Sequence, residues 1–179
     1  HNLYYKTVDV PGWEDIAREL GVLYNTASFD AVQDLFTQIP IARMFELSPT
    51  LGRWVEEFGY TVKRAAIVKC AAHRLDYVPH VDSDVSCLAI NIPLYNCDQT
   101  WTAFYTVTKG SFFQSLQENM LIYYGVTNDA EFEEQCRYHL DKPLLINTKI
   151  PHAVFNPTDQ MRLALTLRFS NDPWHLFSA

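Results

Sequence analysis

Two histidines and an aspartate have the types and spacing needed to hold a metal ion. His80 and Asp82 are separated by one residue in the segment YVPHVDSD, and His152 follows seventy positions after Asp82 (152 minus 82) in IPHAVFN. Alternate residues of a β-strand point to the same face, so His80 and Asp82 can reach a common point. Two imidazoles and a carboxylate on one side of a metal leave the opposite coordination positions open, an arrangement associated with non-haem Fe(II) oxygenases.

Arg162 is placed to bind an anion near such a site. It follows His152 by ten residues (162 minus 152) and opens the segment RLALTLRF. In a strand, Arg162, Thr166 and Arg168 would share one face and the leucines the other. A partly buried guanidinium costs on the order of several kcal/mol unless it meets an anion. Because its planar fork suits a carboxylate, we predict that Arg162 anchors the far carboxylate of a dicarboxylic cosubstrate.

Two neighbouring residues compete for these roles. Asp84 has the same strand parity as Asp82 and could replace it as a ligand. Arg168 could replace Arg162, but six residues of strand separate the two arginines by roughly 20 Å, at about 3.3 Å per residue. The separation from His152 favours Arg162. We therefore expect substitutions at Arg168 to have little effect on cosubstrate binding.

Three further residues are candidates for a pocket. Trp101 and Tyr105 share one face of the segment TWTAFYTV, where they would line a substrate or cosubstrate pocket or simply be core. Asn91 is a polar residue between two isoleucines and needs a hydrogen-bond partner if buried, which makes it a candidate for the cosubstrate pocket. We interpret three other histidines as structural or surface residues: His73, His139 and His175.

Helical patterns occupy about residues 1–60, and strand patterns about residues 61–170. The apolar spacing in PGWEDIAREL predicts a helix over 11–20, a second helix is predicted to begin after Asp30, and Ser48 caps a third. Short segments rich in β-branched and aromatic residues then predict strands: TVKRAAIVKC, VSCLAINIPL, TWTAFYTV, MLIYYGV, PLLINT, HAVFN and RLALTLRF.

Strands at this spacing, without helical crossovers, favour a sandwich or barrel over a parallel sheet. One segment, NDAEFEEQCRYHL (128–140), breaks the pattern, because its opening fits a capping box and its apolar residues recur every four positions. We therefore predict a mostly β fold with N-terminal helices and one helical insertion, in a single domain of residues 1–179. The barrel would be a jelly roll of the cupin-like, double-stranded β-helix type.

The composition limits the partners. A hydrophobic content of 48% and an aromatic content of 14% can form one sizeable core. The formal net charge of -7, with Lys and Arg scattered singly, disfavours nucleic acid. No apolar run approaches the roughly 18 to 20 residues that cross a bilayer, and the first residues lack a signal-peptide pattern, so we expect a cytoplasmic protein without membrane contact. The four cysteines are expected to be free thiols.

The combination of HVD at 80–82, the distal His152 and Arg162 resembles the Fe(II)/2-oxoglutarate-dependent dioxygenases, over about residues 62–169. The resemblance implies a double-stranded β-helix in which the two histidines and the aspartate bind Fe(II). It also implies that Arg162 binds the carboxylate of 2-oxoglutarate that the metal does not bind. The implied activity is that of a hydroxylase, which uses O2 to decarboxylate 2-oxoglutarate to succinate and CO2 while it oxidises a small-molecule or peptidyl substrate.

The chain departs from that family at one position. Members often have a serine two residues after the arginine, where this chain has Ala164. A second hydroxyl contact to the cosubstrate is therefore expected from Thr166 or from a tyrosine.

A cupin-type metal protein, either an isomerase or a ligand-binding barrel, is the alternative. The segment HAVFN also fits the His-x3-Asn pattern of a second cupin motif. A cupin would usually show HxH with a following glutamate, whereas His80 is followed by Asp82, and the six glycines are few for cupin turns. These differences favour the oxygenase interpretation.

Overall fold

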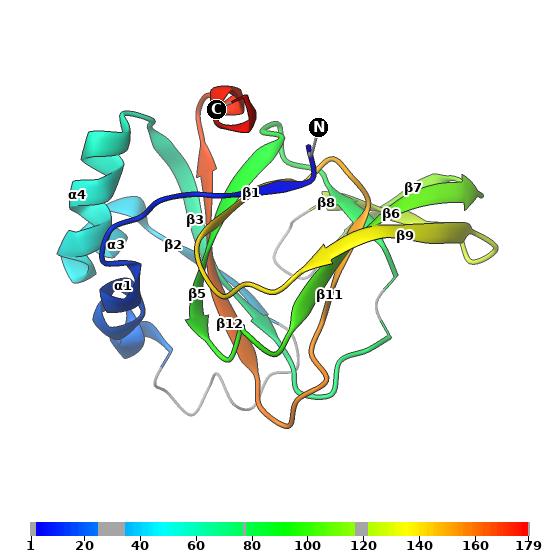
Figure 1. Ribbon diagram of the computed structural model, residues 1–179, viewed down its shortest axis with the longest axis horizontal. Coiled ribbons are helices and arrows are strands. Elements are labelled where there is room, and N and C mark those ends of the chain that lie inside the picture. Colours follow the sequence, from blue (N-terminus) through cyan, green and yellow to red (C-terminus); the bar gives the residue numbers. More distant parts are fainter. Residues whose placement is uncertain (1–2, 25–34, 77, 117–121, 179) are drawn as a thin grey trace.

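The backbone forms two antiparallel sheets of six strands each (Figure 1). They are described by a computed structural model, which covers residues 3–24, 35–76, 78–116 and 122–178. The major sheet has the order β1-β10-β5-β12-β3-β2. Its strands are β1 (Tyr5–Thr7), β10 (Leu144–Asn147), β5 (Leu88–Tyr95), β12 (Arg162–Phe169), β3 (Val62–Cys70) and β2 (Leu35–Ile39). The minor sheet has the order β7-β8-β4-β11-β6-β9. Its strands are β7 (Phe112–Leu116), β8 (Ile122–Val126), β4 (His80–Asp82), β11 (His152–Phe155), β6 (Trp101–Lys109) and β9 (Glu131–Tyr138).

In the described part of the chain, three helices cover the outer face of the major sheet (Figure 1). They are α1 (Trp13–Glu19), α3 (Ile41–Leu47) and α4 (Pro49–Phe58), and two short 3-10 helices lie at Gly21–Leu23 and Trp174–Phe177. The helices predicted at 11–20 and after Ser48 are confirmed. Ser48 accepts a hydrogen bond from the Leu51 amide at 3.2 Å, and Pro49 occupies the first turn, where its missing N–H costs nothing.

Strand β12 separates two apolar cores. Its three leucines pack beneath the helices with residues such as Ile16 and Leu51. Ala164 instead packs between the two sheets, with Phe104 and Tyr138 of the minor sheet. Because alternate residues of a strand face opposite sides, the polar residues that share the parity of Ala164 face the space between the sheets. They are Arg162, Thr166 and Arg168.

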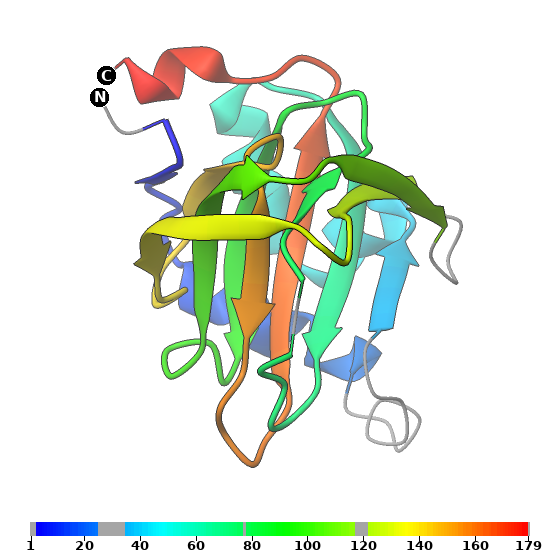
Figure 2. The same cartoon turned by 90° about the vertical axis from the view of Figure 1, so that its right-hand side faces the viewer.

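Aromatic contacts hold the two sheets together on one side. Figure 2 shows strand β9, in yellow, crossing in front of the strands of the major sheet. The Tyr5 ring of β1 lies 4.8 Å from the Tyr138 ring of β9 and stacks at 6.3 Å on the Phe104 ring of β6. Edge strand β1 of the major sheet therefore packs against edge strand β9 of the minor sheet. The architecture is mostly β, a jelly roll with few helices, as the sequence predicted.

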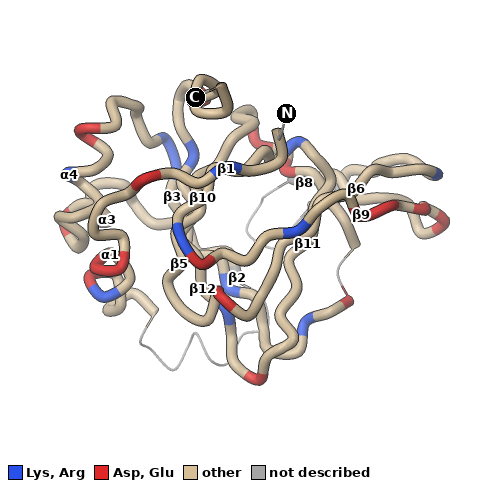
Figure 3. Tube along the Cα trace, viewed as in Figure 1, with Lys and Arg blue, Asp and Glu red and all other residues tan. Residues whose placement is uncertain are grey.

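The helical insertion predicted at 128–140 is wrong, because this segment contains strand β9. Cys136 and Tyr138, two residues apart, pack inward as alternate residues of a strand do. Phe132 contacts Tyr105 on the other face, because the register shifts between the residues that pair with Phe104 and Tyr105. The exposed glutamates follow from the position of β9 at a sheet edge, where charges oppose pairing with other chains. Figure 3 shows several acidic residues along β9, with other acidic residues and the lysines and arginines spread over many elements.

The N-terminal part is less helical than predicted. The start of the helix expected after Asp30 lies outside the described residues, and residues 35–39 form strand β2. With β1, this strand supplies both edges of the major sheet from the first 60 residues. No helix in the described ranges is long and apolar enough to cross a membrane. The single-domain organisation of residues 1–179 stays a prediction.

Candidate metal centre

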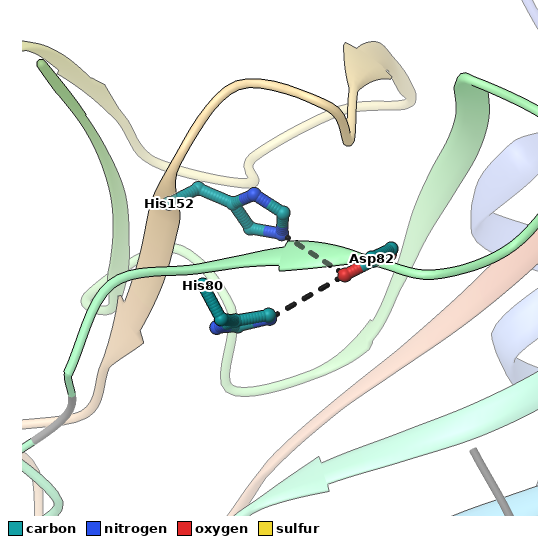
Figure 4. Close-up of side chains that lie close together, drawn as sticks. All are labelled: His80, Asp82 and His152. Atoms are coloured by element: carbon teal, nitrogen blue, oxygen red, sulfur yellow. Dashed lines mark ion pairs between the residues drawn. The ribbon is translucent and has the colours of Figure 1, made fainter. Parts of the chain in front are cut away.

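A three-residue strand places two of the candidate ligands on one face. β4 begins at His80 and ends at Asp82, so both side chains point to the same side of the minor sheet. His152 is the first residue of β11 and lies directly opposite His80 in the antiparallel pair, which puts it on that same face. The three side chains therefore converge, although 70 residues (152 minus 82) separate the second from the third (Figure 4).

One carboxylate oxygen is the centre of the cluster. Nε2 of His80 lies 3.4 Å from Oδ1 of Asp82, and Nε2 of His152 lies 3.5 Å from the same oxygen. One potential ligand atom from each residue lies within 4.8 Å of the others. Ligand atoms that bind one ion at about 2.1 Å are roughly 3 Å apart, so small side-chain rotations suffice to bind a metal. Within the described residues, this is the one cluster of three such groups.

Backbone hydrogen bonds set the orientation of both imidazoles. Nδ1 of His152 lies 2.8 Å from the carbonyl oxygen of Ile150, which can accept a hydrogen bond only from a protonated Nδ1. Nε2 of His152 is then unprotonated in the neutral ring and has its lone pair directed at the cluster. The backbone of Val78 hydrogen-bonds the His80 ring. Such partners fix ring orientation at metal sites.

The protonation states of His80 and Asp82 favour the binding of a metal cation. Burial, followed by the neighbouring His152 ring, lowers the pKa of His80 below its ordinary value, so His80 is neutral at neutral pH. Burial alone would raise the pKa of Asp82, but the neighbouring rings of His152 and His80, and the charge of Arg168, hold that pKa well below its usual range. The site thus offers neutral imidazole and an ionised carboxylate, which are the forms that bind a metal.

The cluster is open on the side of β4. The His152 side chain is only 6% exposed, whereas those of His80 and Asp82 are 24% and 28% exposed. On the far side of β4, His80 is paired with Gly125 of β8, which is buried. The more exposed side of the cluster is therefore the one that His80 and Asp82 present.

Arg168 lies at this cluster, which the sequence did not predict. Its guanidinium donates a hydrogen bond to Oδ2 of Asp82, the oxygen that neither histidine approaches. It also donates to Oγ1 of Thr148 at 2.8 Å and to the carbonyl of Ser86 at 3.4 Å. The strand-length argument did place Arg168 far from Arg162 along β12. The spacing along β12 could not predict how close Arg168 lies to Asp82, because Asp82 is in the other sheet.

Asp84 is occupied elsewhere, which argues against it as a metal ligand. Its carboxylate accepts hydrogen bonds from Nζ of Lys63 at 2.7 Å and from the amide and hydroxyl of Ser86, and it pairs with Arg64. Burial would raise the pKa of Asp84, but the hydrogen bond from Lys63, those from Ser86 and the charge of Arg64 lower it far below its ordinary value. Asp84 therefore holds the segment after β4 in place.

Arg162 is a buried cation that has no acidic partner among the described residues. It is 3% exposed, and its Nε donates a hydrogen bond to Oγ1 of Thr100 at 3.1 Å. Among the described residues, no carboxylate pairs with it. A buried guanidinium in this state is stabilised by a bound anion. The burial of Arg162 is compatible with the anion-binding role that the sequence suggested, and that role stays a prediction.

Further polar groups accompany Arg162 between the sheets. Thr166 and Asn91 are cross-strand neighbours on β12 and β5. In the described part of the chain, neither Oδ1 of Asn91 nor the buried hydroxyl of Tyr138 makes a hydrogen bond of good geometry. Burial raises the pKa of Tyr138, although Thr102 and Arg162 nearby act in the opposite direction. A neutral tyrosine hydroxyl can donate to a carboxylate. Tyr138 was hidden from the sequence analysis because its segment was assigned to a helix.

Trp101 and Tyr105 lie on the face of β6 opposite to the cluster. Phe104, which points to the opposite face from Trp101 and Tyr105, pairs with His152. The rings of Phe104 and His152 are 6.0 Å apart. On the other face, Trp101 stacks on Phe155 at 5.5 Å. Tyr105 is 8% exposed and packs with Ala103 and Ala153. Their pairing therefore gives no support to the prediction that they line a pocket at the metal.

Comparisons with known proteins support the fold. No family model matches the chain, and no curated protein matches it. Among solved structures, the chain is similar to a prolyl hydroxylase from Trichoplax adhaerens in complex with a hypoxia inducible factor oxygen degradation domain peptide fragment. The TM-score is 0.50 at 16% identity, covering 99% of this chain and 88% of that one. At this identity the likeness shows a prolyl hydroxylase-like jelly-roll fold.

Two other structures are similar at a lower score. AviO1 from Streptomyces viridochromogenes Tue57 has a TM-score of 0.48 at 12% identity, over 95% of this chain and 90% of that one. E. coli ycfD has a TM-score of 0.48 at 17% identity, over 86% of this chain and 39% of that one.

Proposed function

We propose that the chain is a non-haem Fe(II)- and 2-oxoglutarate-dependent oxygenase that hydroxylates its substrate. The observation that carries this proposal is the combination, in a prolyl hydroxylase-like fold, of a converging His-Asp-His cluster with a buried arginine that has no acidic partner. Two imidazoles and one carboxylate are the ligands of the Fe(II) oxygenases, and they leave coordination positions for a cosubstrate and O2.

The proposed metal ligands and the proposed cosubstrate anchor lie on different sheets. His80, Asp82 and His152 of the minor sheet would hold the metal. When bound, Fe(II) with 2-oxoglutarate and O2 would supply the oxidising chemistry that yields succinate, CO2 and an oxidised substrate. Arg162 of the major sheet would bind the far carboxylate of 2-oxoglutarate, because it is buried and pairs with no carboxylate among the described residues.

Three polar side chains would complete the cosubstrate site. The Tyr138 hydroxyl would donate to the carboxylate held by Arg162, and Thr166 and Asn91, which are cross-strand neighbours, would provide further polar contacts. Apolar neighbours such as Phe104 and Ala164 exclude water from this space, which strengthens the charge-assisted hydrogen bonds. Tyr138 then takes the place of the hydroxyl that Ala164 lacks.

The substrate would approach the metal on the side of His80 and Asp82, whose side chains are partly exposed. The proposal covers a small molecule or a peptide side chain. The Trichoplax adhaerens enzyme was solved with a peptide fragment, so peptides are the class to test first.

Anaerobic titration tests the proposal directly. Adding Fe(II) and 2-oxoglutarate to the apo protein should produce the weak visible charge-transfer band of the chelate, and admitting O2 should release succinate even without a substrate. Neither signal should appear when glutarate replaces 2-oxoglutarate, because it has no keto acid group to chelate the metal. Metal binding without any 2-oxoglutarate signal would instead favour the cupin-type alternative.

A further inference from the structure

The two oxygens of Asp82 have separate partners. Oδ1 is the atom that both histidines approach, at 3.4 and 3.5 Å. Oδ2 accepts a hydrogen bond from Arg168, which lies on β12 of the opposite sheet. One oxygen of the carboxylate thus faces the metal position, and the other is already engaged by a buried cation.

Arg168 is itself held in a fixed position. It is 5% exposed, and its second terminal nitrogen donates to Oγ1 of Thr148 at 2.8 Å. Thr148 in turn donates its hydroxyl proton to the carbonyl of Cys87 at 2.9 Å, while its own carbonyl accepts the Asp82 amide at 3.0 Å. The guanidinium fork therefore bridges Asp82 to the segment that contains Thr148 and leaves the carboxylate little freedom to rotate.

We propose that Arg168 is a positioning residue that keeps Asp82 a monodentate metal ligand. A carboxylate can bind a metal through one oxygen or through both. With Oδ2 held by Arg168, only Oδ1 is available, so Asp82 fills one coordination position and leaves the rest for other ligands. This role rests on the metal centre of the proposed function, but it does not require 2-oxoglutarate.

The experiment compares cobalt binding by the apo forms of the wild-type protein and Arg168→Met. Co(II) is the probe because its visible absorption reports the ligands around it and because it does not oxidise readily. Loss of partners that orient metal ligands typically weakens metal affinity about 10- to 100-fold, and we expect a decrease of that size in Arg168→Met. The absorption band of the bound Co(II) should also shift, since Asp82 can now rotate and present both oxygens.

Arg64→Met is the matched control. Arg64 lies directly opposite Arg168 on β3 and pairs with Asp84 rather than Asp82. The Arg64→Met substitution removes an arginine at the neighbouring position of the same sheet. It should leave the Co(II) affinity within about 3-fold of wild type and the absorption band unshifted. Arg168→Lys, which keeps the charge but not the fork, should recover part of the affinity.

Thr148→Val provides a second test if Arg168→Met does not fold. It removes the hydroxyl that orients Arg168, so it should shift the Co(II) band in the same direction by a smaller amount. An unchanged band and affinity in a folded Arg168→Met protein, or in Thr148→Val, would overturn the proposal. A wild-type protein that binds no Co(II) would overturn it together with the metal centre. Normal Co(II) binding without 2-oxoglutarate turnover would contradict the proposed function alone.

Discussion

Arg162 and Arg168 lie on the same face of β12, yet within the described residues only Arg168 has a carboxylate partner. The first arginine is buried without such a partner, and the second belongs to a partly buried ion pair. Identical side chains six residues apart (168 minus 162) on one strand are therefore expected to respond differently to substitution.

Arg162 should determine the affinity for the cosubstrate. Arg162→Leu removes the cation and should weaken 2-oxoglutarate binding by about 2 to 4 kcal/mol, or roughly thirty-fold to several hundred-fold. Arg162→Lys keeps the charge but loses the fork and should have a smaller effect. Calorimetric titration of the metal-loaded protein measures both. Arg137→Leu, on the exposed edge strand β9, is the control. An unchanged affinity in Arg162→Leu would remove the arginine from the cosubstrate site.

The two arginines should have opposite effects on the stability of the apo protein. Arg162→Met should leave the free energy of unfolding unchanged or raise it, because Thr100 keeps its hydrogen bond to the Cys97 carbonyl at 2.8 Å and a buried unpaired charge is lost. Arg168→Met leaves Asp82 without its cation and should lower that free energy by about 2 to 3 kcal/mol. Denaturant unfolding measures both variants. Equal losses would show that Arg162 has a partner in the apo protein.

Tyr138→Phe tests the residue that the sequence analysis did not identify. Loss of one hydroxyl that donates to a carboxylate should weaken 2-oxoglutarate binding by about 1 to 1.5 kcal/mol, or roughly 5- to 13-fold. Stability should hold, since the hydroxyl makes no hydrogen bond of good geometry in the described structure. Tyr105→Phe, on the other face of β6, is the control. The idea fails if the two variants bind the cosubstrate equally well.

Substitution of the metal ligands should abolish turnover without unfolding the chain. Asp82→Ala and His152→Ala each remove one of three ligands, so succinate release that depends on Fe(II) and 2-oxoglutarate should be lost in both. Circular dichroism checks that the fold survives. Full uncoupled decarboxylation by both variants would refute the ligand assignment.

Asp84→Asn should separate stability from metal binding, because Asp84 contacts Lys63, Arg64 and Ser86 rather than the cluster. The pKa of Asp84 is lowered in the folded state, so its ionised form stabilises the protein above the ordinary aspartate pKa near 4, and this contribution is lost as the pH falls further. At pH 7 the variant should lose about 2 kcal/mol of unfolding free energy. The difference from wild type should shrink below about pH 4.

Metal affinity in Asp84→Asn should stay within a few fold of wild type. A collapse comparable to that of Asp82→Ala would transfer the ligand role to Asp84. A stability difference that persists unchanged to acid pH would show instead that the charge of Asp84 is not what stabilises the loop.

The features that could be predicted from the sequence are those set by local periodicity. The parity of β4 placed His80 and Asp82 on one face, and the alternation in β12 separated its leucines from its arginines. Strand β9 was assigned wrongly because a four-residue repeat fits both a helix and a strand. The contact between Arg168 and Asp82 joins two sheets, and no local pattern determines which strands of different sheets face each other.

Because the site is divided between two sheets, a bound ligand would affect how strongly the two sheets are held together. The metal ligands lie on β4 and β11, while both arginines lie on β12. A cosubstrate that binds the metal at one end and Arg162 at the other would bridge the two sheets. Its binding free energy would then resist their separation, since a ligand that binds only the folded state raises stability by mass action. Slower hydrogen exchange of the backbone amides in β4 and β11 when the cosubstrate binds would be the evidence for this stabilisation.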